Sequence, residues 1–252
     1  MMTWALDLDG VLWTGARAVP RSSVAVKRLR SAGHEVVFVT NNSFSTIGQQ
    51  EQKLAGFGID AAGRVLNSAQ AGASLIDSGQ RVFVLGGEGI REAVTERGAD
   101  LVTDLNTAPA SIDAVLVGLD WELSYQRLSL AVQAVLVGAR FVATNTDSTY
   151  PTERGLLPGA GALVGAVRAA TGVVPVVAGK PEPPLADLVR ARYGAVGIMV
   201  GDRADTDGAF AKTLGYRFGL VFSGVTKPSD LPVDPTPDVT GADLAELVDR
   251  LA

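Results

Sequence analysis

The side chains of this chain that could do chemistry are carboxylates, hydroxyls, amides, Lys and Arg. Its 252 residues include no Cys and a single His, His34. Disulfides, thiolate zinc sites and thiol nucleophiles are therefore excluded, and a Ser–His triad is disfavoured. The 22 basic and 27 acidic residues give a net charge of −5. This balance disfavours a dedicated nucleic-acid-binding protein, because such a protein normally presents a basic face.

Two carboxylates stand close together near the start of the chain. The motif DLDGV follows a short apolar stretch and places Asp7 and Asp9 two residues apart. Side chains at that spacing point to the same side of an extended strand. Two such charges repel each other unless a cation or a shared proton compensates for them. The pair fits either a functional site or an acidic turn around Gly10, and the motif alone leaves both open.

A second acidic motif follows another apolar stretch. GDRADTD, at residues 201–207, carries Asp202, Asp205 and Asp207. Carboxylate oxygens select hard cations, Mg²⁺ ahead of Zn²⁺. We expect Asp202, which comes directly after the apolar stretch, to bind a metal ion. For Asp205 we expect only a favourable interaction with the dipole at the start of a helix.

Two further polar motifs also end apolar stretches. VTNNS, at residues 39–43, brings hydroxyl, amide and backbone N–H groups into one loop through Thr40, Asn41 and Asn42. These groups suit an anion such as phosphate, although a capping loop before the next helix explains the same residues. In GKP, Lys180 follows a Val-rich stretch of a chain in which Lys is scarce, so it is a candidate for a placed positive charge.

Apolar and helical patterns alternate along the whole chain. The predicted strands are Val-rich and apolar on both faces, as buried parallel strands are, and cover residues 4–8, 35–40, 81–87, 113–118, 140–145, 173–179, 197–202 and 216–222. The predicted helices include residues 22–32, 46–56, 88–97, 124–137, 160–170, 184–193 and 205–214. This alternation indicates the α/β class, with a parallel sheet covered by helices on both faces.

All four polar motifs follow predicted strands, at the carboxyl edge where open α/β sheets bind ligands. Carboxylates, a hydroxyl and amide loop and a lysine converge there. This combination suits phosphoryl transfer, because Lys and Mg²⁺ neutralise the charge of the phosphoryl group while a carboxylate attacks its phosphorus. Residues 81–145, between the stretches that carry the motifs, indicate a second, smaller α/β domain inserted into the first.

Together, DLDGV, VTNNS, GKP and GDRADTD resemble the four motifs of the haloacid dehalogenase (HAD) superfamily, in order and over the whole chain. VFVLGGEG at 82–89 and the segment 143–164 resemble its p-nitrophenylphosphatase and nucleotide monophosphatase branch. The resemblance implies a Rossmann-like core in residues 1–80 and 175–252, with an α/β cap domain of the C2 type in residues 81–174. It also implies a Mg²⁺-dependent phosphatase, a hydrolase that cleaves small phosphate monoesters through an aspartyl-phosphate.

The resemblance assigns catalytic and metal-binding roles by motif position. Asp7 is the expected nucleophile, and Asp9 is the expected general acid and base. Asp7, Asp202 and the backbone carbonyl of Asp9 would bind Mg²⁺. Asp207 would lie next to these ligands and support the metal site.

The resemblance also implies how the substrate binds. Thr40 and Asn41, together with Asn42, would hold the phosphoryl oxygens, and Lys180 would steady both nucleophile and phosphate. Tyr150 matches a position that faces the substrate in relatives, although a packed aromatic side chain explains it equally well. The substrate would be a small phosphorylated metabolite, and the cap would choose which one.

Two positions depart from the pattern of the branch. Gly208 stands where a bulky apolar residue is usual, and Lys212 stands where a small residue is usual. Both concern the packing of the helix after the fourth motif and not the catalytic groups. We expect the three tryptophans to be packing residues: Trp4, Trp13 and Trp121.

Alternatives of two classes stay open at this point. One is a phosphomutase or a dehalogenase on the same fold, and the other is a phosphate-binding or regulatory protein without turnover. The first residues lack the pattern of a secretory signal, and no stretch reaches the roughly 20 apolar residues of a membrane span. We therefore expect a cytoplasmic protein without membrane or nucleic-acid partners, and the resemblance implies that a homodimer can form through the cap.

Overall fold

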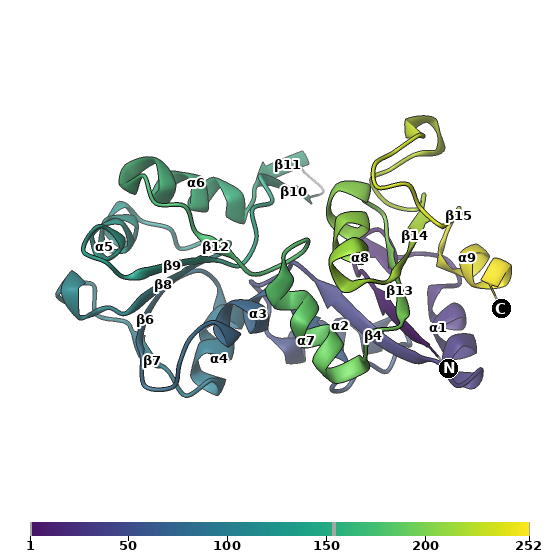
Figure 1. Cartoon of the computed structure of the whole chain (residues 1–252), viewed down its shortest axis with the longest axis horizontal. Helices are drawn as coiled ribbons and strands as arrows, with labels where there is room; N and C mark the ends of the chain where they lie inside the picture. Colours follow the sequence, from purple (N-terminus) through teal and green to yellow (C-terminus); the bar gives the residue numbers. More distant parts are fainter. Residues whose placement is uncertain (1, 153–154, 252) are drawn as a thin grey trace. The chain divides into compact units, whose positions relative to one another are not determined.

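The chain forms two compact α/β units, of which this computed structural model describes residues 2–152 and 155–251 (Figure 1). The core unit comprises Met1–Thr40, Gly48–Leu66 and Lys180–Ala252, and the second unit comprises Asn41–Ile47 and Asn67–Gly179. Along the chain, the second unit is therefore inserted into the first. The α/β class, with a Rossmann-like core and an inserted α/β unit, agrees with the sequence-based prediction.

The core unit is built on a six-stranded sheet with the order β15-β14-β13-β1-β4-β5. β1 pairs in parallel with both β13 and β4, and β14 pairs in parallel with β13 and β15. Parallel strands bring their carboxyl ends to one edge, so the residues after β1, β4, β13 and β14 meet there. The strands are β1 (Thr3–Leu6), β4 (Glu35–Thr40), β5 (Val65–Asn67), β13 (Gly197–Gly201), β14 (Arg217–Val221) and β15 (Val239–Gly241).

Helices cover both faces of the core sheet. α1 packs against α9, and α7 packs against α8 (Figure 1). The connections from β1 to β4 and from β13 to β14 run in opposite directions across the sheet, so right-handed crossovers place α1 and α8 on opposite faces. The helices are α1 (Ser22–Ser31), α2 (Ile47–Gly56), α7 (Pro183–Tyr193), α8 (Ala209–Leu214) and α9 (Leu244–Leu251).

Shorter elements complete the core unit. A small antiparallel hairpin of β2 (Trp13–Thr14) and β3 (Arg17–Ala18) follows β1. A π-helical turn at Ala204–Gly208 connects β13 to α8, and a 3₁₀ turn occupies Pro228–Asp230. The hairpin and the π-helical turn follow strands whose carboxyl ends carry the acidic motifs, so both elements shape the edge where those motifs meet.

The second unit has a five-stranded parallel sheet with the order β12-β9-β8-β6-β7. Its strands are β6 (Arg81–Leu85), β7 (Asp100–Val102), β8 (Ala114–Val117), β9 (Arg140–Ala143) and β12 (Val176–Val177). Its helices are α3 (Ser68–Ser74), α4 (Glu88–Glu96), α5 (Tyr125–Leu136) and α6 (Ala160–Thr171), with a 3₁₀ turn at Pro109–Ser111. β10 (Thr149–Thr152) and β11 (Gly155–Pro158) form an antiparallel hairpin.

The apolar core of the second unit forms between one face of its sheet and the helices α5 and α6. Alternate residues of each strand point to that face, because side chains alternate along a strand. Phe83, Val115 and Phe141 from three strands pack there with Leu130 of α5 and Val164 of α6. Burial of these large apolar side chains stabilises the second unit independently of the core sheet.

All eight predicted strands are present, most of them shorter than predicted by one to three residues at an end. The sequence analysis missed seven strands of two to four residues each, because so short a segment shows no periodicity: β2, β3, β5, β7, β10, β11 and β15. It also missed α3, whose sequence SAQAGAS has small side chains and no apolar stripe. The start of α3 is fixed by a capping box in which Asn67 and Gln70 bond each other's backbone N–H groups.

The compact units divide the chain after residues 40, 47, 66 and 179, whereas the predicted domains divide it after residues 80 and 174. The limits of a functional cap domain stay a prediction. Of the tryptophans, Trp4 and Trp13 are buried as expected, while Trp121 is 68% exposed and packs with one side against the ring of Phe44, at 4.6 Å between centroids. None of the helices in the described ranges is long and apolar enough to cross a membrane.

Candidate active site

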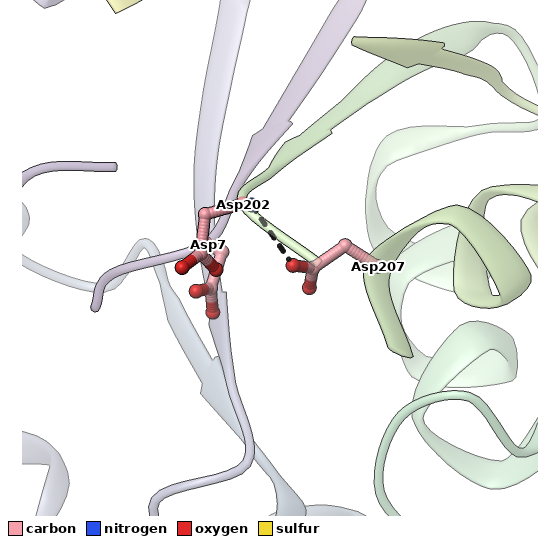
Figure 2. A group of neighbouring side chains, drawn as sticks. All are labelled: Asp7, Asp202 and Asp207. Carbon is pink, nitrogen blue, oxygen red and sulfur yellow. Dashed lines mark hydrogen bonds between the residues drawn. The ribbon is translucent and has the colours of Figure 1, made fainter. Parts of the chain in front are cut away.

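Three carboxylates meet at the carboxyl edge of the core sheet. Asp7 directly follows β1, Asp202 directly follows the neighbouring strand β13, and Asp207 lies in the π-helical turn after β13. One oxygen from each carboxylate lies within 4.8 Å of those from the other two. Figure 2 shows Asp7 and Asp202 side by side, with the Asp207 carboxylate turned toward the backbone of Asp202. All three side chains are buried.

Lys180 joins this cluster from the chain segment that returns to the core unit. Its Nζ donates hydrogen bonds to Asp7 Oδ1 at 2.6 Å and to Asp207 Oδ1 at 2.7 Å. The side chain is only 4% exposed, so both are buried ion pairs. One lysine thus pairs with two of the three carboxylates.

The element before Lys180 corrects one prediction. The predicted strand 173–179 is reduced to β12, and β12 pairs with β9 in the sheet of the second unit. Lys180 therefore does not end a strand of the sheet that carries Asp7, although its charge reaches Asp7. The long flexible stem of the lysine allows this reach.

The crowding of buried charges shifts their pKa values. Burial raises the pKa of Asp7 well above its ordinary value, and Asp207 and Asp202 add to this effect, while Lys180 opposes it. Burial, together with the charge of Asp207, raises the pKa of Asp202 to about 6. Burial alone would lower the pKa of Lys180, but the charges of Asp207 and Asp7 outweigh burial and raise it. The cluster therefore holds more negative charge than one lysine compensates.

The turn after β13 fixes Asp207. Its Oδ2 accepts hydrogen bonds from the backbone N–H groups of Asp202 and Arg203, each at 3.2 Å. Its other oxygen accepts from Lys180, so the carboxylate is held from two directions. Asp205 instead forms an exposed ion pair with Arg203 at 2.7 Å. Asp205 thus takes no part in the cluster; it lies in the first turn of the π-helical segment, as expected, and its carboxylate also pairs with Arg203.

The loop after β14 also contributes to the site, and the sequence analysis missed it. The backbone N–H of Val225 donates to Asp202 Oδ2 at 2.6 Å, and the Ser223 hydroxyl donates to the Gly10 carbonyl, also at 2.6 Å. Gly10 has a φ of +80°, and a Cβ there would collide with the Asp202 carboxylate. The position of this loop, after the predicted strand 216–222 at the same edge, was the available signal.

Asp9 differs from the other acidic residues of the site because it is exposed. Its Oδ1 accepts a hydrogen bond of 2.7 Å from the indole Nε1 of Trp13. The two residues also form an isolated backbone bridge. Asp9 is thus accessible to solvent on a loop whose geometry is defined by Trp13.

The second motif spans the division between the two units. Thr40 is the buried last residue of β4 and belongs to the core unit, while the next residues belong to the second unit. The Asn41 carbonyl accepts hydrogen bonds from the Ser68 hydroxyl at 2.7 Å and the Asn145 amide at 2.8 Å. Asn42 Oδ1 accepts from the N–H groups of Phe44 and Ser45. This side-chain oxygen serves the capping turn that the sequence analysis had kept as an alternative.

Tyr150 lies in the hairpin of the second unit. It is half-buried in β10, opposite Leu157 of β11. The predicted substrate-facing role therefore concerns a residue of the unit that does not carry the acidic cluster.

The two departures from the branch pattern have structural explanations in the core unit. A Cβ on Gly208 would come within 2.8 Å of the ring of Phe218, which is buried and fills the space that a larger residue would occupy. Lys212 lies on the exposed side of α8, 3.6 Å from Asp234. Gly208 therefore concerns packing, as expected, whereas Lys212 lies at the surface and does not take part in the packing of the helix.

The donor set of the cluster fits Mg²⁺. Asp7, Asp202 and Asp207 supply hard oxygen atoms at mutual distances that one cation can span, and the group contains no nitrogen or sulfur ligand. The raised pKa values of Asp7 and Asp202 indicate that the surroundings of these two carboxylates lack sufficient positive charge. A divalent cation would supply it.

The chain is similar to known proteins in sequence and in fold. Residues 4–100 match the family model for haloacid dehalogenase-like hydrolases, and residues 177–247 match the model for HAD-hydrolase-like proteins. The 5'-nucleotidase YutF of Bacillus subtilis is 36% identical over 238 residues, which cover 92% of this chain and 91% of the relative.

Two solved structures are similar over nearly the whole chain. The p-nitrophenyl phosphatase from Archaeoglobus fulgidus has a TM-score of 0.92 at 29% identity, covering 99% of this chain and 98% of that one. The glycerol phosphate phosphatase Rv1692 from Mycobacterium tuberculosis, solved in complex with magnesium, has a TM-score of 0.89 at 34% identity. Its match covers 97% of this chain and 76% of that one.

The fold and the acidic site define a hydrolase of the haloacid dehalogenase type. The chain belongs to this family, in the branch of p-nitrophenylphosphatases and nucleotide monophosphatases. It is a Mg²⁺-dependent phosphatase that cleaves phosphate monoesters through an aspartyl-phosphate, as phosphatases of this family do.

Proposed function

We propose that Asp7 is the nucleophile of this phosphatase and that its substrates are small phosphorylated metabolites. The observation that carries the proposal is the buried group of Asp7, Asp202 and Asp207 beside Lys180 at the carboxyl edge of the core sheet. Among the acidic residues near that edge, Asp7 is the one that directly ends the central strand β1. The chain contains no Cys, and its single His, His34, comes before the amino end of β4, whereas the motif residues are at the carboxyl ends of the strands.

The reaction proceeds in two displacements at phosphorus. The Asp7 carboxylate attacks the phosphoryl group, forming an acyl phosphate while the bond to the leaving alcohol breaks. The Lys180 ammonium, 2.6 Å from Asp7 Oδ1, stabilises the negative charge of the nucleophile and of the transferred phosphoryl oxygens. A water molecule then attacks the same phosphorus and releases inorganic phosphate and free Asp7.

Asp9 moves the protons of both steps. It donates a proton to the departing alkoxide in the first step and takes one from the attacking water in the second. The exposure of Asp9 supports this role, because the group must reach the substrate and exchange protons with solvent. The buried carboxylates are engaged with Lys180 and with backbone N–H groups.

Mg²⁺ would be held by Asp7 and Asp202, with Asp207 beside them and the backbone carbonyl of Asp9 completing the protein ligands. Bound there, the ion supplies positive charge that offsets the repulsion between the nucleophile and the phosphate. Asp207 contributes its negative charge and also anchors Lys180 at 2.7 Å.

Substrate binding is divided between motif residues and the second unit. We assign the phosphoryl oxygens to Thr40 and Asn41, with Asn42 supporting their loop through its capped turn. The second unit, in the predicted limits 81–174, serves as the cap, and Tyr150 contributes to substrate choice. Relatives named for nucleotide, nitrophenyl and glycerol phosphate hydrolysis support small monoesters as the substrate class. A cytoplasmic location and a homodimer through the cap belong to the same proposal.

Phosphate release from a panel of phosphorylated metabolites and from p-nitrophenyl phosphate tests this function. We expect turnover with Mg²⁺, complete loss of turnover in excess EDTA, and full recovery when Mg²⁺ is restored. A phosphomutase would instead move the phosphoryl group within the substrate without releasing phosphate. Full turnover in EDTA, or binding without phosphate release across the whole panel, would contradict the proposal.

A further inference from the structure

The loop after β1 folds back on itself and returns Trp13 to Asp9. The backbone N–H groups of Leu12 and Trp13 both donate to the carbonyl of Leu8, at 2.9 and 3.3 Å. The N–H of Gly10 donates to the carbonyl of Trp13 at 2.6 Å. Asp9 and Trp13, four residues apart in sequence, are thereby placed next to each other in the loop after β1.

The indole ring of Trp13 is held on several sides. Trp13 is only 3% exposed, and its ring lies 5.7 Å from the ring of Phe57, measured between centroids. The ammonium of Lys53 lies 4.0 Å from the centroid of the Trp13 ring, within the range of a cation–π interaction. A ring packed in this way has a defined rotamer, so its Nε1–H has a fixed direction. That direction leads to Asp9 Oδ1 at 2.7 Å.

We propose that Trp13 is a positioning residue for Asp9, which fixes the rotamer of the general acid and base. The inference rests on the role of Asp9 in the proposed function. An exposed carboxylate on a loop otherwise rotates among several rotamers, and each misdirected rotamer reduces the rate of proton transfer. With Oδ1 bound to the indole, Oδ2 is the oxygen that exchanges the proton with leaving group and water.

A purely structural role for Trp13 makes different predictions, and Trp4 provides the comparison. Trp4 is also buried in the core unit, at 2% exposed, but its Nε1 has no hydrogen-bond partner among the described residues. Replacing either indole by a benzyl group removes an N–H group and some packing volume. Only at position 13 does the change remove a contact to a reacting group.

The kinetic test compares Trp13→Phe with Trp4→Phe, using glycerol 3-phosphate and p-nitrophenyl phosphate as substrates. We expect Trp13→Phe to lower kcat/KM for glycerol 3-phosphate about tenfold, because alkoxide departure needs the acid, with a smaller loss for the aryl ester. Trp4→Phe should change both values alike and only slightly. In an Asp9→Asn background, the effect of Trp13→Phe should vanish. Equal losses for both esters, or an undiminished loss in the Asp9→Asn background, would overturn the proposal.

A spectroscopic measurement tests the contact without relying on the folding of Trp13→Phe. The chain has three Trp residues, so the ¹⁵N-labelled protein gives three indole N–H signals, which Trp4→Phe and Trp121→Phe assign. We expect Asp9→Asn to shift the Trp13 indole signal and leave the other two in place. An unmoved Trp13 signal would show that the indole does not bind Asp9 in solution. The acid role of Asp9 is tested separately, by the leaving-group dependence of Asp9→Asn alone.

Discussion

The core unit and the second unit each contain an ion pair with a buried carboxylate, and the two pairs differ in their charge balance. In the second unit, Arg127 donates to Asp120 Oδ2 from both Nε and Nη2, at 3.2 and 2.8 Å, and also to the carbonyl of Val84. The other oxygen of Asp120 accepts the N–H of Glu122. The pair of Arg127 and Asp120 thus has balanced charges, one positive and one negative. In the core unit, Lys180 faces two carboxylates directly, and a third lies beside them.

This difference separates a structural ion pair from a functional one. A buried pair with balanced charges and satisfied hydrogen bonds costs little to keep. A buried group with excess negative charge is costly, and the raised pKa values of Asp7 and Asp202 express that cost. Such a group persists where a cation and an anionic substrate complete it. The contrast gives two predictions that compare the two ion-pair clusters, and a third that compares a residue of the acidic cluster with an exposed neighbour.

The largest expected effect comes from Asp7→Asn, compared with Asp120→Asn. Asp7→Asn removes the nucleophile and should lower kcat by at least about 10³-fold. The metal-free protein should keep its thermal stability, because a costly buried charge is removed. Asp120→Asn should leave kcat close to the wild-type value and lower the melting temperature, because Arg127 loses its counter-charge. Steady-state kinetics and thermal denaturation check both variants, and retained activity in Asp7→Asn would contradict the account.

The second comparison is between Lys180→Met and Arg127→Met. Each substitution leaves buried carboxylate groups without their positively charged side-chain partner. In the absence of divalent ions, each should therefore lower the free energy of unfolding by about 3 kcal/mol. Mg²⁺ should restore part of that loss only in Lys180→Met, because only that cluster binds the ion. Activity should be lost in Lys180→Met and retained in Arg127→Met. Equal stabilisation of both variants by Mg²⁺ in denaturation experiments would show that the two clusters do not differ as described.

The smallest of the three expected effects is a change in the Mg²⁺ requirement of Asp202→Asn. Its matched control is Asp205→Asn. Asp202→Asn should raise the Mg²⁺ concentration for half-maximal activity at least about tenfold, because even outer partners of metal ligands contribute that much. Asp205 lies three residues away, is exposed and pairs with Arg203, so Asp205→Asn should leave the Mg²⁺ requirement unchanged. Titration of activity with Mg²⁺ measures both, and a similar shift in the two variants would mean that the effect is general electrostatics.

The residues that sequence analysis located best are those at the ends of buried strands. Asp7 and Asp202 follow continuous apolar stretches, and parallel pairing then brings them together without further information. Lys180 does lie beside Asp7, but the reason for choosing it, its place after a strand of the same sheet, was wrong. Its preceding strand β12 pairs in the other sheet, because an apolar strand of two residues carries no signal for its partner.

Other features of the site depend on contacts that no local pattern encodes. The bond from Trp13 to Asp9 requires the loop after β1 to fold back, so Trp13 was predicted only to pack. The bond from the Val225 N–H to Asp202 joins residues 23 positions apart through backbone alone, and any residue type except Pro supplies such a donor. Glycine at position 208 likewise reflects a tertiary contact, because the ring of Phe218 occupies the space that a side chain there would need.

The central claim, that Asp7 carries the phosphoryl group, is tested most directly by trapping the intermediate. The enzyme is quenched in acid during turnover of p-nitrophenyl phosphate and treated with borohydride, which reduces an acyl phosphate to the alcohol and leaves free carboxylates unchanged. Peptide mass spectrometry then locates the reduced side chain. The account predicts reduction at position 7, at a level that matches the burst of nitrophenol. Reduction at another carboxylate, or a nitrophenol burst with Asp7 unreduced, would contradict it.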